Sequence, residues 1–352
     1  MGKIRVLIVD DSAYSRQTIK RVLEKDSGIE VIDISSDGVD AMAKTLRLKP
    51  DIITLDLEMP EMGGFSFLRW LMKKNPIPVI VVSSFSDSKT VFKALELGAA
   101  DFIAKPTRIT MQESRNLEKD LLRKVKGVKD LRMDRLSKNL EIFEEQQIQQ
   151  APPEISEQEV KVVAIGSSTG GPTALQIILT QLPADFPAAL AISQHMPKGF
   201  TLPFAQRMNG ISQIEIKEAQ NGDLLEIGTA LICPGGYHLS FKKRGKRVYA
   251  SLKEPKASDK YIPSVTTMMS SLAGIYESAV MGVVLTGMGS DGKDGMLEIK
   301  GKGGYTIVES EDTAVVFGMP AEVIKVGAAG RVLPISEIPS EIIKLVKKTE
   351  LS

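Results

Sequence analysis

The sequence has one cysteine, Cys233, and only two histidines among 352 residues. One cysteine cannot build a disulfide framework or a multi-cysteine zinc site within a chain, and such a composition is typical of a reducing compartment. An excess of one charge is also lacking, because 45 basic residues balance 44 acidic residues to give a net charge of +1. This balance predicts no broad electrostatic attraction to nucleic acid or to an anionic membrane.

Long hydrophobic runs are missing as well. The N-terminal segment MGKIRVLIVDDS is an apolar strand that acids interrupt after a few residues, so it is too short for a signal peptide. No apolar run reaches the roughly 20 residues that a membrane-spanning helix needs. We therefore expect a cytoplasmic protein without direct membrane insertion. With 43% hydrophobic and 25% charged residues, a chain of this length suits two globular domains.

Short apolar runs alternate with helical periodicity over residues 3–106. We predict helices around Ser15–Lys25 and Gly38–Leu48. The predicted strands are Ile4–Val9, Ile29–Ser35, Ile52–Leu55, Val79–Val82 and Ala100–Ile103. Alternating strands and helices indicate a parallel, doubly wound α/β sheet.

The composition changes between about residues 110 and 158. A densely charged stretch with helical spacing comes first, and Leu117, Leu121 and Val125 are expected to pack on the first domain. The segment QQIQQAPPEISEQE follows, which is polar, contains proline and has no periodicity, as is typical of a mobile linker. We predict three regions: a first domain over 1–125, a charged and polar linker over 126–158, and a second domain over 159–352.

A second alternating pattern begins at Lys161. It predicts a helix over Pro172–Leu182. The predicted strands are VVAIG, Leu190–Ser193, Ala279–Leu285 and Tyr305–Val308. Shorter alternating segments over 212–253, separated by NGD and PGG, predict a mainly antiparallel excursion. The second domain is thus expected to be doubly wound α/β with an antiparallel insertion.

Polar side chains follow the predicted strands of the first domain. Asp10 and Asp11 follow the first strand, Asp56 the third, Ser83 ends the fourth, and Lys105 follows the fifth. The carboxyl ends of parallel strands share one edge of a sheet, so these groups should converge there. Clustered carboxylates repel one another, and Mg2+ with its preference for oxygen ligands would compensate. An aspartate carboxylate can also accept a phosphoryl group.

The segments LIVDDS, DLEMPEMGG, VVSS and KP occur in the order in which response-regulator receiver domains carry them, and residues 3–125 resemble that family. The resemblance implies a flavodoxin-like (βα)5 fold and phosphorylation of Asp56 by a chemotaxis histidine kinase. It implies that Asp10, Asp11 and Asp56 bind Mg2+. It also implies that the residues of the conformational switch are Ser83, Phe102 and Lys105.

Three residues of the second domain fit a serine hydrolase. Ser168 in AIGSSTGGP lies between a strand and a helix, where backbone N–H groups could stabilise an oxyanion. His195 in QHMPKGF and Asp291 in LTGMGSDGKDG also follow predicted strands. In a Ser–His–Asp arrangement the serine attacks, the histidine exchanges the proton, and the aspartate orients the imidazole. The chain order and the missing G-x-S-x-G turn disfavour the α/β-hydrolases.

Alternatives remain for each position of this triad. Ser167 is adjacent to Ser168 and could be the nucleophile instead, because only the position within the motif favours Ser168. Asp294 lies in the same glycine-rich loop as Asp291, and either could be a turn residue. His238 lies in an alternating stretch and is expected on a strand or turn, whereas Cys233 is expected to be a buried strand residue.

The segments IGSSTGG, QHMPKGF, CPGG, PSV, LTGMGSDG and VVFGMPAE resemble the catalytic domain of the chemotaxis protein-glutamate methylesterase family. The resemblance implies hydrolysis of glutamate γ-methyl esters on methyl-accepting chemoreceptors, with release of methanol. Deamidation of receptor glutamines is a further implied reaction. The implied triad is Ser168, His195 and Asp291, with backbone groups of Thr169 and Met288 at the oxyanion site. No cofactor is implied for the esterase domain.

Two other functions remain possible at this point. GSSTGG could cradle a phosphate or nucleotide, although it lacks both G-x-G-x-x-G and a P-loop lysine. A DNA-binding output domain is disfavoured by the neutral charge and by the absence of a recognisable helix-turn-helix. For the receiver-linked esterase, we expect the unphosphorylated receiver to cover the Ser168 site and phosphorylation to expose it.

Overall fold

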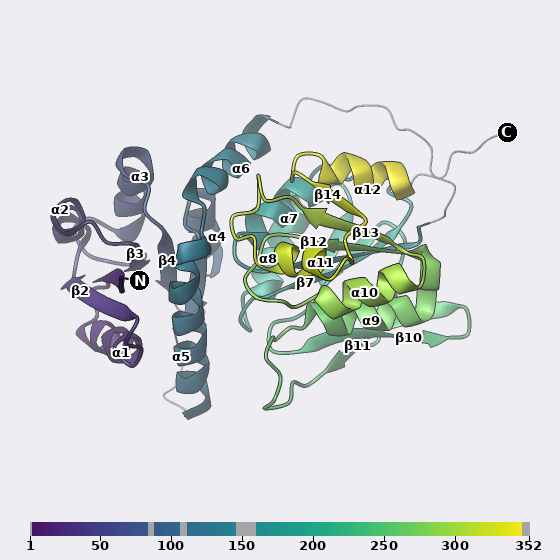
Figure 1. Ribbon diagram of the computed structural model, residues 1–352, viewed down its shortest axis with the longest axis horizontal. Helices are drawn as coiled ribbons and strands as arrows, with labels where there is room; N and C mark the ends of the chain where they lie inside the picture. Colours follow the sequence, from purple (N-terminus) through teal and green to yellow (C-terminus); the bar gives the residue numbers. More distant parts are fainter. Residues whose placement is uncertain (1, 84–87, 106–110, 146–159, 347–352) are drawn as a thin grey trace. The chain divides into compact units, whose positions relative to one another are not determined.

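The structure is a computed structural model that describes residues 2–83, 88–105, 111–145 and 160–346 (Figure 1). The chain divides into two compact units, Met1–Ser137 and Lys138–Ser352. The expected linker segment QQIQQAPPEISEQE spans residues 146–159 and lies outside the described residues. Each unit is described by itself.

The first unit is built on a five-stranded parallel sheet with the order β2-β1-β3-β4-β5. This order is that of the flavodoxin-like fold, and it confirms the predicted α/β architecture. Its strands are β1 (Ile4–Val9), β2 (Ile29–Ser35), β3 (Ile52–Leu55), β4 (Val79–Ser83) and β5 (Asp101–Ala104).

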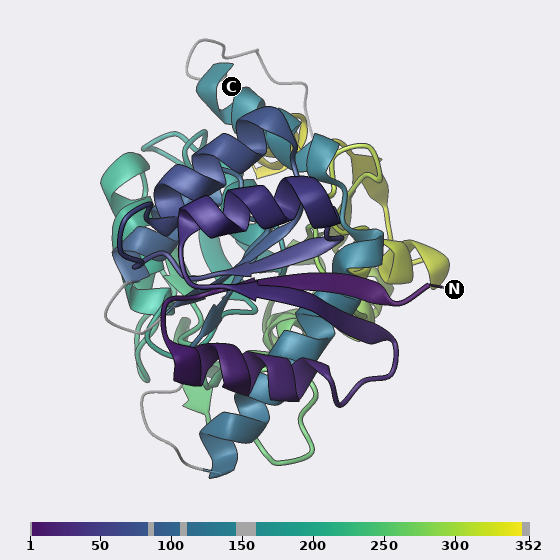
Figure 2. The same cartoon turned by 90° about the vertical axis from the view of Figure 1, so that its left-hand side faces the viewer.

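Helices cover both faces of this sheet (Figure 2). They are α1 (Ala13–Leu23), α2 (Gly38–Leu48), α3 (Gly64–Lys74), α4 (Ser88–Glu96) and α5 (Met111–Lys126). Helix α1 contacts α5, and α2 contacts α3. Side chains in the connecting loops start the helices, because Ser12 caps α1 and Asp37 accepts hydrogen bonds from Val39 and Asp40 at the start of α2.

The chain after the fifth strand is largely helical as far as Glu145. Leu117, Leu121 and Val125 of α5 lie in the hydrophobic core of the first unit, as predicted. A short 3-10 helix, Gly127–Asp130, and helix α6 (Met133–Glu145) follow.

The second unit contains a seven-stranded sheet with the order β14-β13-β12-β6-β7-β9-β8, in which every neighbouring pair is parallel. Its strands are β6 (Val162–Ser167), β7 (Ala189–Gln194), β8 (Glu215–Glu218), β9 (Thr229–Ile232), β12 (Val280–Val284), β13 (Tyr305–Glu309) and β14 (Arg331–Leu333). The order reverses at β6, because β7 lies on one side of it and β12 on the other. Ligands of such sheets bind at the carboxyl ends of the strands beside that point.

Helices lie on both sides of the second sheet (Figure 1). They are α7 (Gly171–Leu179), α8 (Thr201–Ile211), α9 (Val265–Tyr276), α10 (Lys293–Gly301), α11 (Met319–Lys325) and α12 (Ile338–Val346). Helix α9 packs on β6, β7 and β12 and against α10, whereas α7 contacts α12.

The antiparallel insertion is confirmed but is smaller than expected. Among the described strands, the antiparallel pair is β10 (His238–Arg244) with β11 (Arg247–Lys253), which packs on α9, and a single antiparallel bridge joins Leu224 to Tyr249. The prediction that β8 and β9 belong to this insertion is wrong, because both are parallel strands of the main sheet. Their short alternating sequences fit a parallel or an antiparallel strand equally well. Only the partner strand determines which of the two is formed.

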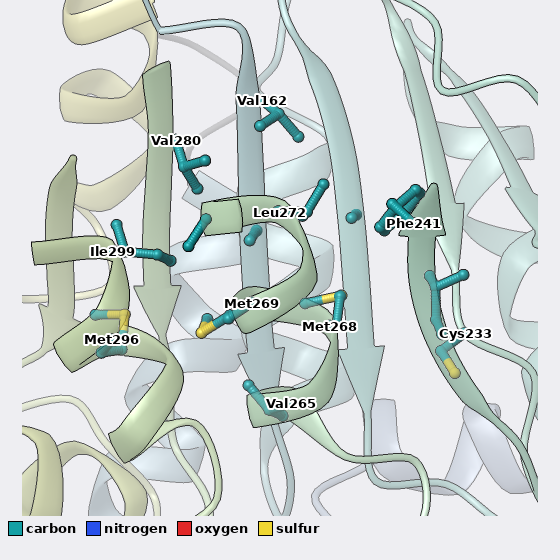
Figure 3. Packing of buried hydrophobic residues seen from close by; sticks show 14 of the residues in the cluster. Val162, Cys233, Phe241, Val265, Met268, Met269, Leu272, Val280, Met296 and Ile299 are labelled. Atoms are coloured by element: carbon teal, nitrogen blue, oxygen red, sulfur yellow. The ribbon is translucent and has the colours of Figure 1, made fainter. Parts of the chain in front are cut away.

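Helix α9 lies over the sheet, roughly along the direction of its strands (Figure 3), and its apolar face is buried. Val265, Met268, Met269 and Leu272 on this face are fully buried. Val265 lies so close to β6 that a Cβ built on Gly166 would be 2.2 Å from Val265 Cγ1. The glycine of the AIGSS segment therefore lets the first turn of α9 rest directly on the central strand.

This contact predicts that Gly166→Ala destabilises the protein by about 1–3 kcal/mol, because the stiff valine cannot move aside. In the double variant with Val265→Ala, the loss in the free energy of unfolding should be smaller than the sum of the two single losses. Urea unfolding followed by circular dichroism measures these values. Gly274→Ala in the same helix, where a Cβ meets nothing within 4 Å, should be neutral or stabilising. Strictly additive losses would rule out the contact as the cause.

Candidate functional site

The first polar cluster lies at the carboxyl edge of the first sheet. One carboxylate oxygen from each of Asp10, Asp11 and Asp56 lies within 4.8 Å of the others. Lys105 Nζ lies 2.5 Å from Asp56 Oδ2 and 3.0 Å from Asp10 Oδ2. The structure thus brings together four of the residues that the sequence predicted for this site.

The charges of this cluster are incompletely balanced. Burial and the charge of Asp10 raise the pKa of Asp56 above its ordinary value, although Lys105 opposes the shift. Burial lowers the pKa of Lys105, but its contacts with Asp56 and Asp10 outweigh that effect and raise it. A set of three carboxylates with this unfavourable charge fits a hard divalent cation such as Mg2+.

The predicted switch residues lie on the strands beside this cluster. Ser83 is buried at the end of β4, and its carbonyl accepts a hydrogen bond of 2.7 Å from the N–H of Lys105. Phe102 on β5 is also buried, and its ring makes an edge-on contact with Phe92 at 6.3 Å between centroids. The ammonium group of Lys124 lies 5.3 Å from the same ring. Phe102 therefore faces inward, packed against charge and aromatic surface.

The second polar cluster lies at the carboxyl ends of three adjacent strands of the second sheet. Ser168 follows β6, His195 follows β7, and Asp291 lies in the loop after β12. Ser168 and Asp291 are buried, at 3% and 4% exposure. The three residues therefore gather beside the point where the strand order reverses.

His195 and Asp291 form a direct pair. His195 Nε2 lies 2.8 Å from Asp291 Oδ2. The backbone N–H groups of Val265 and Thr266, in the first turn of α9, donate to the same carboxylate at 2.7 and 3.0 Å. Burial alone would raise the pKa of Asp291, but the hydrogen bond and charge of His195 and these N–H groups lower it to about 2. The ionised aspartate leaves Nδ1 as the ring nitrogen that can take a proton.

The two adjacent serines differ in their hydroxyl contacts. Ser167 Oγ donates a hydrogen bond of 2.6 Å to Gln194 Oε1, so its hydroxyl is engaged in the core. The backbone of Ser168 is fixed on both sides, since its N–H donates to Thr286 and its carbonyl accepts from Gln194 Nε2. Within the described part of the chain, no hydrogen bond joins Ser168 Oγ to His195, and such bonds often form only with substrate.

Close backbone packing surrounds Ser168. A Cβ on Gly287 would lie 2.8 Å from Ser168 Cβ, and one on Gly171 would lie 2.1 Å from the side-chain oxygen of Gln194. Thr286 Oγ1 donates to the carbonyl of Thr169 at 2.9 Å, which joins the loop of Ser168 to the loop that carries Met288. Thr169 and Met288 thus belong to two loops that meet at the serine.

Sequence reasoning did not identify Tyr261. Its ring stacks on that of His195, with centroids 5.2 Å apart and planes 6° from parallel. Its hydroxyl oxygen accepts a hydrogen bond of 3.1 Å from the N–H of Ser290. Burial would raise the pKa of Tyr261, but this hydrogen bond and Lys260 lower it. No motif marks this residue, because only the fold brings position 261 to the histidine.

The remaining candidates have other partners. His238 begins β10 and pairs with Asp259 at 2.9 Å, a second His–Asp pair that the sequence did not indicate. Asp294 lies in the first turn of α10, and its carboxylate makes no hydrogen bond to His195 among the described residues. Cys233 is fully buried after β9, and burial raises the pKa of its thiol to about 12.

Comparisons with known proteins agree with both clusters. The family model for the response regulator receiver domain matches residues 6–114, and that for the CheB methylesterase matches residues 163–342. The chain is 44% identical to protein-glutamate methylesterase/protein-glutamine glutaminase 3 of Geobacter sulfurreducens, over 98% of each chain. It is 41% identical to protein-glutamate methylesterase/protein-glutamine glutaminase 1 of Myxococcus xanthus, over 99% of this chain and 98% of the relative.

A crystal structure of the Thermotoga maritima CheB methylesterase catalytic domain is 42% identical to this chain, covers 54% of it and 100% of that domain, and superposes with a TM-score of 0.52. The chain is therefore a response regulator with a receiver domain and a hydrolase domain. It belongs to the CheB methylesterase family. This membership confirms both resemblances and disfavours the nucleotide-binding and DNA-binding alternatives. Among the described residues, no helix is long and apolar enough to cross a membrane.

The lowered pKa of Asp291 predicts a pH-dependent stability. A folded pKa of about 2 against an ordinary value of 3.8 stabilises the fold above pH 3.8, and this contribution is lost as the pH falls toward 2. From pH 5 to 2, wild type should lose about 2 kcal/mol more of its free energy of unfolding than Asp291→Asn.

Urea unfolding followed by circular dichroism measures this difference. The only tryptophan, Trp70, lies in α3 of the first unit, so its fluorescence serves as an internal control that should be the same in both proteins. The same pH dependence in both proteins would exclude the ionised Asp291 as its source.

Proposed function

We propose that this chain hydrolyses glutamate γ-methyl esters on methyl-accepting chemoreceptors and that phosphorylation of Asp56 regulates the reaction. The observation that most supports this proposal is the His195–Asp291 pair. His195 Nε2 lies 2.8 Å from Asp291 Oδ2, at the same edge of the sheet as Ser168. The relatives that match the chain almost end to end are named for protein-glutamate methylesterase activity, which supports this substrate. The single cysteine supports a cytoplasmic location.

The residues divide the chemistry of acyl transfer among them. Ser168 Oγ attacks the ester carbonyl carbon while His195 Nδ1 takes the hydroxyl proton. The imidazolium is stabilised by Asp291, and the oxyanion is stabilised by backbone N–H groups of Thr169 and Met288. His195 then gives its proton to the departing methoxide, which leaves as methanol. Water attacks the acyl-serine by the reverse route and leaves a glutamate.

The same site can deamidate a glutamine side chain. The carbonyl carbon, the acyl-serine and the glutamate product are the same, and only the leaving group changes from methanol to ammonia. The names of the relatives carry both activities, methylesterase and glutaminase. We therefore include receptor glutamine deamidation in the proposal.

The receiver domain supplies the regulation in this proposal. Asp10, Asp11 and Asp56 would hold Mg2+, which supplies positive charge that offsets the phosphoryl oxygens. A histidine kinase of the chemotaxis system donates the phosphoryl group to Asp56. Lys105, which already contacts Asp56, would pair with the new anion, and Ser83 and Phe102 would respond to it.

We predict that Ser168→Ala abolishes methanol release from methylated chemoreceptor membranes, a loss on the order of 10^4-fold or more, because the acyl-serine cannot form. Ser340→Ala, an exposed serine of α12, is the matched control and should retain full activity. Peptide mapping after reaction with a fluorophosphonate should find the label on Ser168. Label on Ser167 instead would contradict the assigned nucleophile.

A small phosphodonor with Mg2+ should increase methanol release by the wild-type protein and have no effect on Asp56→Asn, because the acyl phosphate cannot form there. Removing Mg2+ with a chelator should abolish the increase and leave the basal rate. Asp130→Asn, an exposed aspartate of the same unit, should respond as wild type does. An equal increase in Asp56→Asn would place the phosphoacceptor elsewhere.

A further inference from the structure

The segment 254–264 joins β11 to α9 and passes the catalytic histidine. It carries Tyr261, whose ring stacks on His195, and it ends at Ser264, the N-cap of α9. Ser264 Oγ also lies 3.3 Å from Asp291 Oδ1. One stretch of chain therefore contacts both the histidine and the aspartate of the triad.

A single buried imidazole, that of His238, contacts this segment at two positions, Asp259 and Ser264. His238 Nδ1 accepts a hydrogen bond of 3.0 Å from the N–H of Ser264, so Nδ1 carries no hydrogen. The hydrogen must then be on Nε2, which donates to Asp259 Oδ2 at 2.9 Å. The same carboxylate of Asp259 also accepts a hydrogen bond of 2.8 Å from the N–H of Lys256. Residues 259 and 264 are thereby held at fixed positions with Tyr261 between them.

Tyr261 is anchored at its hydroxyl end as well. Its oxygen accepts from the N–H of Ser290, the residue before Asp291. A Cβ on Gly289 would lie 2.3 Å from that oxygen, and Gly289 has a φ of +94°. Gly289 thus makes room for Tyr261. The loop that carries Asp291 and the ring that stacks on His195 are therefore fixed to each other.

The reaction requires a particular ring orientation at His195. Nε2 must stay on Asp291 while Nδ1 faces Ser168, and a single hydrogen bond to Asp291 would by itself allow the ring to tilt about that bond. A parallel ring at 5.2 Å covers one face of the imidazole and opposes this tilt. Misplacement of a reacting group by about 1 Å can cost about 100-fold in rate.

We propose that Tyr261 is a positioning residue for the esterase reaction and that the His238–Asp259 pair holds it against His195. The inference rests on the proposed function. Tyr261 acts through its ring on the orientation of His195, and it does not exchange protons with the substrate. The contribution therefore appears in kcat rather than in KM.

Three variants of the full-length protein test this role, with methylated receptor membranes as substrate. Tyr261→Leu removes the ring and should lower kcat about 10–100-fold with little change in KM. Tyr261→Phe keeps the ring and should remain within about 3-fold of wild type. Tyr276→Leu, a half-buried tyrosine of α9 far along the helix, is the matched control and should keep kcat even if the protein becomes less stable.

The His238–Asp259 pair is tested through Asp259→Ala, since Asp259 is the more exposed partner, with 30% side-chain exposure against 8% for His238. This change should lower kcat in the same direction, by about 3–10-fold. If Asp259 acts through Tyr261, combining it with Tyr261→Leu should lower kcat no further than Tyr261→Leu alone. Multiplied losses would overturn the proposed link between the pair and the tyrosine.

The rate at which Ser168 reacts with a fluorophosphonate separates this inference from the proposed function. Slower labelling of Tyr261→Leu than of wild type, with circular dichroism unchanged, supports the positioning role. Equal labelling and equal kcat, or a rise in KM alone, would overturn it while the esterase proposal stands. Failure of the wild-type serine to react would instead count against the proposed function itself.

Discussion

The second unit depends on how it keeps a negative charge in its interior. Asp291 is almost fully buried, and a carboxylate in such a place is costly unless it is paired and hydrogen-bonded. The first turn of α9 supplies two N–H donors, and the positive end of the helix dipole adds to them. Val265 of that turn rests on Gly166 of the central strand, so the packing that stabilises the fold also orients the group that holds His195.

The first unit also contains buried carboxylates, but their negative charge is compensated less completely. Its three carboxylates lie close together with Lys105 as the cationic partner, and the pKa of Asp56 is raised rather than lowered. An incompletely compensated cluster responds strongly to a cation or to a phosphoryl group. The two carboxylates thus differ in a way that fits the roles proposed for them. Asp291, fully hydrogen-bonded, suits a residue that orients the histidine, and Asp56, incompletely compensated, suits an acceptor of a phosphoryl group.

Much of this was predictable from the sequence, because it depends on local order. Strands Ile4–Val9, Ile29–Ser35 and Ile52–Leu55 have the predicted bounds, and the polar residues after strands converge as parallel sheets require. The direction of β8 and β9 was not predictable, since alternation does not reveal the partner strand. Tyr261 and the His238–Asp259 pair were missed because their contacts join residues 21 to 66 positions apart that no motif connects.

The protonation pattern of His195 tests the central claim most directly. The chain has two histidines, so nitrogen NMR of the histidine-labelled protein can resolve both rings without ambiguity once His238→Gln is compared with wild type. In its neutral form the His195 ring should carry its hydrogen on Nε2, which lies 2.8 Å from Asp291, and the Nε2 signal should change in Asp291→Asn. A hydrogen on Nδ1, or a His195 signal unaffected by Asp291→Asn, would contradict the orientation on which the proposed catalysis depends.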